Sequence, residues 1–535
     1  MKRSSLPLLA SLLFVSARAM AQAAPPAPPA PPAPPSTPGV PSVPDSPAPP
    51  PPMAGLQQPP MATATHQGTT IELTTLHLLL EKGVISQAEY DSAAHDLNDS
   101  VGDKVGETNT VVMGKWATTL YGFLEADSIY DSTQSLNDLA GNATIAKPGT
   151  YAQDNGRVQF GARNSRIGIR MKAPEVNGIR TSGVAEMDFL GNQNPVGTGV
   201  SGSGTDTEGQ YFTNPAFRAR HLYVKMETDY VDFLFGQTWQ LYGWQSVYHP
   251  ASVEIQGLPG QIYSRTPQVR ISKSVKSDDF LFELAVAAMR PPQRDSAIPE
   301  GQAGIRLGTP RWSGVMTNGA TGTSVQPLSI ALTGDARSFR LPNYVSNPAN
   351  VGGGTEKLGT SIAVDAIIPI IPAKKRQGNA LTVNGEFSTG FGNADLYTGL
   401  SGGATVPVYN ITKANAAGTN ADIDPGFAVY DSTGNVHLIQ WTSYLVGVQY
   451  TLPGLDGKWW LAANYSHISS NNLNHFYSGV GKVLGGEDFY DANLFADMGA
   501  AVRLGLEYAM FDDLYANSDI HARNNRVQFS AFYIF

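Results

Sequence analysis

The sequence contains no cysteine among its 535 residues. This excludes disulfide frameworks, cysteine-ligated zinc or iron–sulfur centres, and catalysis by a thiol. Charged residues make up only 15% of the chain, against about 25% in an ordinary soluble domain. The net charge of −9 argues against a general nucleic-acid binder, because such proteins carry clustered positive charge.

Long apolar runs are also missing, since no window offers about 18 consecutive apolar residues, the length that predicts a transmembrane helix. A short apolar run at residues 6–15 follows Lys2 and Arg3 and precedes Ala19-Met20-Ala21. This is the pattern of a cleaved export signal, which we assign to residues 1–21. An exported chain without a membrane helix is either soluble or spans a membrane as a β-barrel.

Two segments separate this signal from the main body of the chain. Residues 22–68 are rich in Pro and Ala, which predicts an extended polyproline tether. Residues 69–112 carry leucines at helical spacing and a capping-box pattern at Ser86–Glu89, which predicts a short α-helical segment. We interpret this segment as an oligomerisation element; the alternative is that it only stiffens the tether.

From residue 113 to residue 535 the pattern changes to alternation. Leu120, Leu124 and Ala126 share one face of a segment whose other face carries Glu125 and Asp127. Strands with one apolar and one polar face are typical of membrane barrels, although a soluble sandwich shows the same alternation. This stretch gives 16 strands roughly 26 residues each with their connections; eighteen strands fit nearly as well.

The last strand favours the barrel. Apolar side chains stand at every second position up to Tyr533 and Phe535, with Arg526, Gln528 and Ser530 between them. The pattern resembles the C-terminal assembly signal of bacterial outer-membrane barrels, and it implies recognition by the barrel-assembly machinery. We therefore expect an all-β fold, a transmembrane antiparallel β-barrel of about 16 strands, wide enough to enclose an aqueous channel.

Local motifs resemble one porin family. Gly236-Gln237-Thr238-Trp239, Leu241-Tyr242, Gly257, Gly260 and the segment Arg265–Arg270 are similar to the DcaP-like porins, as are Tyr121-Gly122-Phe123 and the strand Ala162–Gly168. The resemblance implies a homotrimer of sixteen-stranded barrels in the outer membrane of a Gram-negative bacterium. It also implies a periplasmic N-terminal segment and a preference for small anionic solutes such as dicarboxylates. This chain departs from the family by its long Pro/Ala tract.

Anion preference cannot come from overall charge, because residues 113–535 hold 31 Lys and Arg against 36 Asp and Glu. Strand parity places Arg166, Arg170 and Arg270 inside the barrel, where guanidinium groups attract carboxylates. Arg163 and Arg265 have the opposite parity, which predicts a loop, a rim or a bulge. The alternative is that these arginines form ordinary interior salt bridges.

Two acidic residues complete the candidate pore lining. We expect Glu125 and Asp127 to form the wall of the constriction opposite the arginines. The resemblance places Arg270 where a constricting loop is expected. His221 falls on the inward face with Tyr223 and Lys225, and we expect it to line the channel.

Signals for an enzyme or a cofactor are weak. Gly197–Gly202 matches a dinucleotide-binding pattern but lacks a following helix, and Asp422–Gly426 holds only part of a calcium-loop pattern. The nine histidines show no metal-binding spacing, so we expect no metal and no cofactor. Trp239, Trp459 and Trp460 suit the aromatic belts of a membrane barrel better than a catalytic cleft.

The sequence therefore predicts an outer-membrane porin, embedded in lipid, that gives passive diffusion of small hydrophilic solutes and favours anions. No enzymatic activity and no nucleic-acid partner are expected. Two alternatives remain open: a structural protein that tethers the envelope through its Pro-rich arm, and an outer-membrane enzyme.

Overall fold

The computed structural model describes residues 110–113, 116–139, 145–191, 215–245, 247–292, 296–320, 322–342, 354–398, 400, 428–430, 435–476, 484–516 and 518–535. The predicted export signal, the Pro/Ala-rich segment and the helical segment up to residue 109 lie outside these residues. Gly197–Gly202 and Asp422–Gly426 also lie outside them. The described chain begins with a short strand, Thr110–Met113, just before the predicted start of the barrel.

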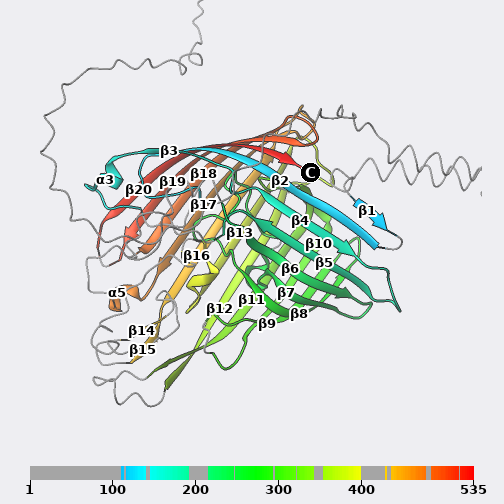
Figure 1. Cartoon of the computed structure of the whole chain (residues 1–535), viewed down its shortest axis with the longest axis horizontal. Helices are drawn as coiled ribbons and strands as arrows, with labels where there is room; N and C mark the ends of the chain where they lie inside the picture. The colour runs from blue at the N-terminus through cyan, green and yellow to red at the C-terminus, as the bar shows by residue number, and fades with distance from the viewer. Residues whose placement is uncertain are drawn as a thin grey trace, which may run out of the picture. The chain divides into compact units, whose positions relative to one another are not determined.

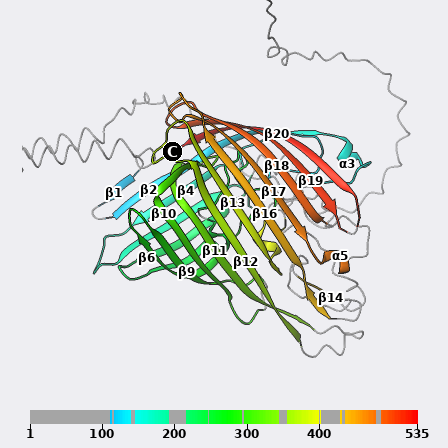
Figure 2. The same ribbon diagram turned by 180° about the vertical axis from the view of Figure 1, so that it is seen from behind.

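Strands make up most of the described chain (Figures 1 and 2). Those of the first half are β1 (Thr110–Met113), β2 (Trp116–Asp131), β3 (Arg157–Gly161), β4 (Arg166–Lys172), β5 (Arg180–Asp188), β6 (Arg218–Glu227), β7 (Asp232–Trp239), β8 (Arg265–Lys276), β9 (Leu281–Met289) and β10 (Glu300–Thr317). Those of the second half are β11 (Thr323–Pro342), β12 (Gly354–Ile371), β13 (Ala380–Phe391), β14 (Ala428–Tyr430), β15 (Val436–Leu438), β16 (Gln440–Thr451), β17 (Trp459–Ser470), β18 (Leu484–Asp497), β19 (Val502–Tyr515) and β20 (His521–Ile534).

Helical elements in the described residues are short: α3 (Tyr151–Asp154), α5 (Leu473–Phe476) and the 3-10 turns η1 (Tyr242–Trp244) and η3 (Ala394–Leu396). Within the part of the chain that the structure describes, no helix is long and apolar enough to cross a bilayer.

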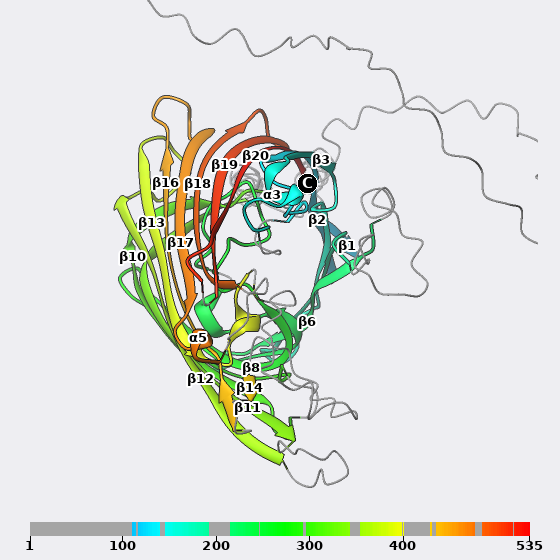
Figure 3. The ribbon, with the colours of Figure 1, turned by 90° about the vertical axis from the view of Figure 1, so that its left-hand side faces the viewer.

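The strands close into one ring. Strand β2 pairs with β4 on one side and with β20 on the other, and every strand between them pairs antiparallel with its neighbours. The ring holds 16 strands. In addition, β3 pairs with the end of β2 (Asp127–Asp131), and β1 pairs with its beginning. Figure 3 shows the strands encircling the interior. The predicted antiparallel β-barrel is therefore confirmed, and its closure leaves no unpaired sheet edge in the ring.

The two faces of the wall have opposite chemistry. On β2, Leu124 is 52% exposed on the outer face, whereas Glu125 is 2% exposed on the inner face. On β20, Val527 and Phe529 lie outside and Arg526 lies inside. A soluble sandwich buries its apolar face, so an apolar outside around a polar inside indicates a wall that faces lipid.

Strand length differs around the ring. Strands β4 to β7 contain 7, 9, 10 and 8 residues, whereas β10, β11 and β12 contain 18, 20 and 18. The barrel therefore has a short wall and a tall wall.

The ring closes next to the C-terminus, where Gly122 and Phe535 exchange two backbone hydrogen bonds of 3.0 Å each. Gly122 has φ +154°, and a Cβ atom there would lie 2.2 Å from the carbonyl oxygen of Arg166. Only glycine fits this crossing of β2, β4 and the C-terminus.

We therefore expect Gly122→Ala to weaken closure of the barrel, because its methyl group must push β4 away from β2. The fraction of barrel that resists SDS without heating should fall, as measured by heat-modifiable gel mobility. Gly499→Ala is the matched control, since nothing lies within 4 Å of its Cβ position. Equal SDS resistance of both variants would contradict this account of the closure.

Candidate functional site

Residues 240–245 and 247–264 lie between β7 and β8 and fold into the barrel; we call them the inward loop. Tyr242, Tyr248 and Ile262 of this loop are almost completely buried. The turn η1 packs against the inner faces of β11 and β12. The interior is therefore narrowed by the chain's own backbone.

The wall supplies acceptors for backbone N–H groups of the inward loop. The donor–acceptor pairs, all 2.8–3.0 Å long, are Tyr242 to Gln302, Gly243 to Thr333, Val253 to Asn493, Glu254 to Glu507 and Ile262 to Glu386. These acceptors stand on five different strands, β10, β11, β18, β19 and β13. A buried N–H without a partner costs about 1–3 kcal/mol, so this arrangement holds the loop at one depth.

Gly257 allows the inward loop to pass close to other groups. Its φ is +96°, and a Cβ atom there would lie 2.6 Å from Oγ1 of Thr398 and 2.7 Å from the ring of Tyr263. The sequence motif that contains Gly257 thus marks a turn that a larger residue would strain.

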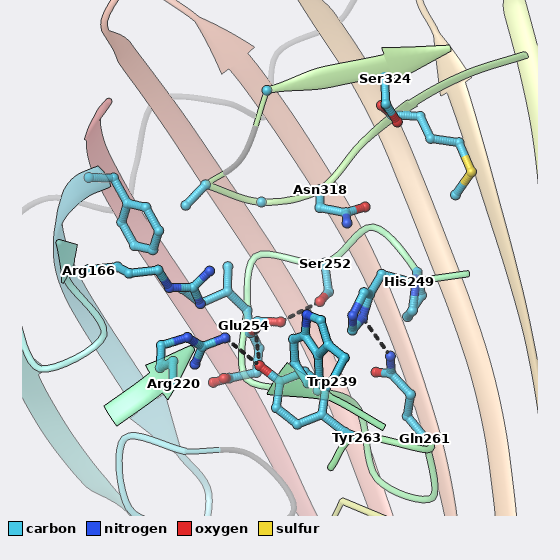
Figure 4. Close-up of a pocket in the computed structure, with 18 of the residues that line it drawn as sticks. Arg166, Arg220, Trp239, His249, Ser252, Glu254, Gln261, Tyr263, Asn318 and Ser324 are labelled. Carbon is cyan, nitrogen blue, oxygen red and sulfur yellow. Dashed lines mark hydrogen bonds between the residues drawn. The ribbon is translucent and has the colours of Figure 1, made fainter. Parts of the chain in front are cut away.

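A cavity of about 300 Å³ lies beside the inward loop. Its lining includes Arg166 and Arg220 from the wall, Trp239 at the end of β7, and His249 and Tyr263 from the loop (Figure 4). Guanidinium groups and aromatic rings therefore face the same space.

Three arginines of this region share two carboxylates. Arg220 donates to Glu186 and to Asp188, both at 2.9 Å, and Arg218 pairs with Asp188 at 2.6 Å. Arg166 lies 3.5 Å from Glu186, and its Nε has no hydrogen-bond partner among the described residues. These three arginines and two carboxylates together carry a net positive charge.

Arg265 adds a fourth guanidinium. It lies over the ring of Trp239 at 4.6 Å and over the ring of Tyr263 at 5.3 Å. One terminal nitrogen of Arg265 has no hydrogen-bond partner in the described chain. We call Arg166, Arg218, Arg220 and Arg265 the arginine cluster.

The arginine cluster changes the ionisation of two side chains in the inward loop. Although burial acts in the opposite direction, the charges of Arg220, Arg265 and Arg166 lower the pKa of Tyr263 to about 8. Burial, followed by the same arginines, lowers the pKa of His249 to about 3, so its imidazole is neutral at pH 7. The lowered pKa of Tyr263 reflects the positive charge of the cluster, because burial alone would raise it.

Strand parity alone missed Arg220. The β5–β6 register shifts between Glu186 and Met187, so that Arg220 and His221 both lie on the inner face. Such a β-bulge redirects a side chain that regular alternation would place outside. His221 hydrogen-bonds Thr238 at 3.0 Å inside the barrel.

The other predicted arginines lie apart from the cluster. Arg163 sits between β3 and β4, where it pairs with Asp138 at 3.1 Å. Arg170 is exposed and lies 5.0 Å from the centre of the Tyr121 ring. Arg270 lies on β8 and donates to the carbonyl of Trp239 at 2.6 Å. The constricting loop therefore precedes Arg265 instead of containing Arg270.

The prediction for Glu125 and Asp127 needs a correction. Both face inward, but β2 pairs directly with β4, so they lie beside Arg166 and not across from it. Strands β3 and β4 follow β2 along the chain and both pair with it, so their residues lie next to those of β2 in the ring. Asp127 accepts hydrogen bonds from Ser530 at 2.6 Å and Asn164 at 3.1 Å, which ties it to the wall.

Two predicted belt residues are also inside. Trp239 lines the cavity, and Trp460 is 1% exposed and stacks on Phe495 at 4.9 Å. Trp239 lies inside because the chain turns into the barrel directly after it, where the inward loop begins. Among the described residues, no group of three or more His, Asp or Glu is placed to hold a metal ion.

Glu254 of the inward loop generates a pH prediction. Burial raises its pKa to about 8; Arg526 opposes the rise and Glu507 adds to it. Because the folded state binds this proton more tightly than the unfolded state, stability falls as pH rises from the ordinary glutamate pKa towards 8. Glu254→Gln cannot ionise and should lose that part of the slope, measured as the unfolding temperature in detergent between pH 5 and pH 8.

The exposed Glu356 provides the control: Glu356→Gln should keep the wild-type slope. If Glu254→Gln follows the wild-type pH profile as well, the loop does not depend on a neutral Glu254.

No protein-family model matches this chain, and no curated protein matches it in sequence. Among solved structures, the outer membrane channel DcaP of Acinetobacter baumannii is similar, with a TM-score of 0.54 and 17% identity over 79% of this chain and 99% of that chain. OmpT, an outer membrane protein of Vibrio cholerae, gives a TM-score of 0.40 and 12% identity over 80% of this chain and 100% of its own. Salmonella typhi OmpF gives a TM-score of 0.43 and 10% identity, with coverages of 80% and 100%.

The predicted resemblance to DcaP is thus confirmed at the level of the fold: this chain forms a sixteen-stranded barrel similar to that of an outer membrane channel.

Proposed function

We propose that this protein is an outer-membrane porin that lets small hydrophilic solutes diffuse passively and favours anions such as dicarboxylates. The ring of strands, its apolar outer face and the likeness in fold to the DcaP channel support the channel role. The protein acts without chemistry of its own on the solute.

The arginine cluster is the observation that carries the anion preference. Three guanidinium groups share two carboxylates, Glu186 and Asp188, on the wall beside the inward loop, and Arg265 adds a fourth guanidinium over the ring of Trp239. The barrel as a whole carries a net negative charge. The positive charge of the arginine cluster can therefore favour anions only through its position at the narrow part of the interior. Arg170, on the same inner face of β4 as Arg166, extends the positive wall along the barrel.

The short wall supports assembly into a homotrimer. A strand of eight residues, tilted by about 45°, rises only roughly 20 Å, less than the ~25 Å apolar band of a membrane barrel. Apolar side chains on this wall are nevertheless exposed, among them Leu222, Val224 and Phe235. Contact with neighbouring copies covers such a wall better than lipid does.

The ends of the chain complete the proposal. Tyr533 and Phe535 act as the signal read by the barrel-assembly machinery, consistent with the outward position of Tyr533 and the pairing of Phe535 with Gly122. Residues 1–21 direct export, and the segment before the barrel lies in the periplasm.

The test of anion preference uses Arg166→Ala, Arg170→Ala and the double variant in planar bilayers. A guanidinium about 8 Å from an ion, at an effective dielectric constant of about 20 and after screening by salt, contributes about 0.8 kcal/mol. Each variant should therefore lower the permeability of the anion roughly fourfold, seen as a shift of the reversal potential in a salt gradient towards the cation value. The double variant should shift it further.

Arg340→Ala is the control, since Arg340 pairs with Glu356 on an exposed part of β11. It should keep the wild-type reversal potential. If the Arg166 and Arg170 variants also keep the wild-type reversal potential, the arginines are structural and the anion preference is wrong. A wild-type barrel that carries no current favours the alternative of a structural protein that tethers the envelope.

A further inference from the structure

The hairpin of β10 and β11 leaves the barrel wall before it turns. The register of β10 against β11 shifts between Thr309 and Ser313, and residues 313–317 are then all buried instead of alternating. A β-bulge bends a strand locally, which fits a change of direction at this point. We call residues 313–320 and 322–327 the hairpin tip.

Beyond the bulge, the hairpin tip packs over the ends of other strands. Its hydrogen bonds reach residues next to β12, on β13 and on β16: Ala373 donates to Ser313, Thr382 to Val315, and the Thr317 amide to Gln449. In the ring, β11, β12 and β13 lie between β10 and β16. The tip therefore runs inside the ring and not along the wall.

The hairpin tip then meets the far wall. Arg503 of β19 donates to the carbonyl oxygens of Asn318 at 3.1 Å and Gly319 at 2.7 Å. Ala320 is buried in an apolar cluster with Val253 of the inward loop and with Trp460 of β17. Six strands lie between β10 and β19 along the ring, so this contact crosses the interior.

The hairpin tip also touches the inward loop. A Cβ atom at Gly319 would lie 2.6 Å from the carbonyl oxygen of Ser252. The cavity that Arg166 and Arg220 line is also lined, from the tip, by Asn318, Ser324 and Gln326 (Figure 4). The cavity thus has the arginine cluster on one side and the tip on another.

We propose that the hairpin tip forms a second constriction of the channel, in series with the inward loop, and that Arg503 sets its aperture. This inference rests on the proposed channel function. The polar side chains that the tip presents to the cavity, Asn318, Ser324 and Gln326, carry amides and a hydroxyl, and the tip's other lining residues carry no charge either. The second constriction therefore selects solutes by size, after the arginine cluster has selected them by charge.

Because the chain has no cysteine, one introduced thiol reports on the tip directly. Asn318→Cys should lose ion current when a bulky thiosulfonate reagent is added, by roughly twofold or more, since the added group fills a narrow aqueous passage. Gly499→Cys is the control: it lies in the turn before β19, with nothing within 4 Å of its Cβ position. Its current should be unchanged by the reagent.

Arg503→Met tests the contact between Arg503 and the hairpin tip. Without the guanidinium, the carbonyls of Asn318 and Gly319 lose their donors, so the mean conductance and the current noise should rise. Arg503 also pairs with Asp497 at 2.7 Å, and in the variant Asp497 keeps a partner in Arg376 at 2.5 Å. Arg376→Met is the matched control, because Arg376 also lies over Trp460, at 5.4 Å, but its Nε donates to Gly457. It should conduct like the wild type.

The outcomes separate the two proposals. A wild-type barrel that conducts, together with Asn318→Cys and Arg503→Met variants that behave like their controls, overturns the second constriction and leaves the channel function standing. A silent wild type that is opened by Arg503→Met supports both proposals. No current from any correctly folded variant overturns the channel function and, with it, the constriction.

Discussion

The structure depends on the need to satisfy backbone polar groups that are placed inside a barrel. A chain folded into the interior brings N–H groups away from bulk water, and each needs an acceptor. Here the acceptors are inward side chains of five strands, including Glu386 and Glu507. The same side chains that make the inner face polar therefore fix the inward loop and, through it, the shape of the interior.

The depth of the inward loop in turn determines what the arginine cluster can do. On an open surface, four guanidinium groups would be screened by water and salt within about a Debye length. Beside the inward loop, Arg166 and Arg220 line a small cavity together with Trp239 and Tyr263, and Arg265 lies over the rings of these two residues. Placement, and not the net charge of the barrel, gives these groups their influence, and the lowered pKa of Tyr263 has the same cause.

Strand alternation predicted the inward position of Arg166 and the outer face of the last strand, and together with the aromatic C-terminal pattern it predicted the barrel. It failed where the backbone departs from alternation. Arg220 entered the interior through a β-bulge, and Trp239 came inside because the chain turns inward directly after it. Glu125 was placed across from Arg166 because parity gives the face of a residue but not its distance around the ring. Bulges and inward turns arise from long-range packing, which a period of two residues does not encode.

We propose above all that the barrel is a water-filled passage whose positive wall favours anions. The most direct measurement is the reversal potential of the purified wild-type protein in a planar bilayer, with the same chloride salt at different concentrations on the two sides. We expect a steady current that reverses at a potential of the sign expected for anions. A reversal potential of the cation sign would contradict the role of the arginine cluster, and the lack of any current would contradict the channel itself.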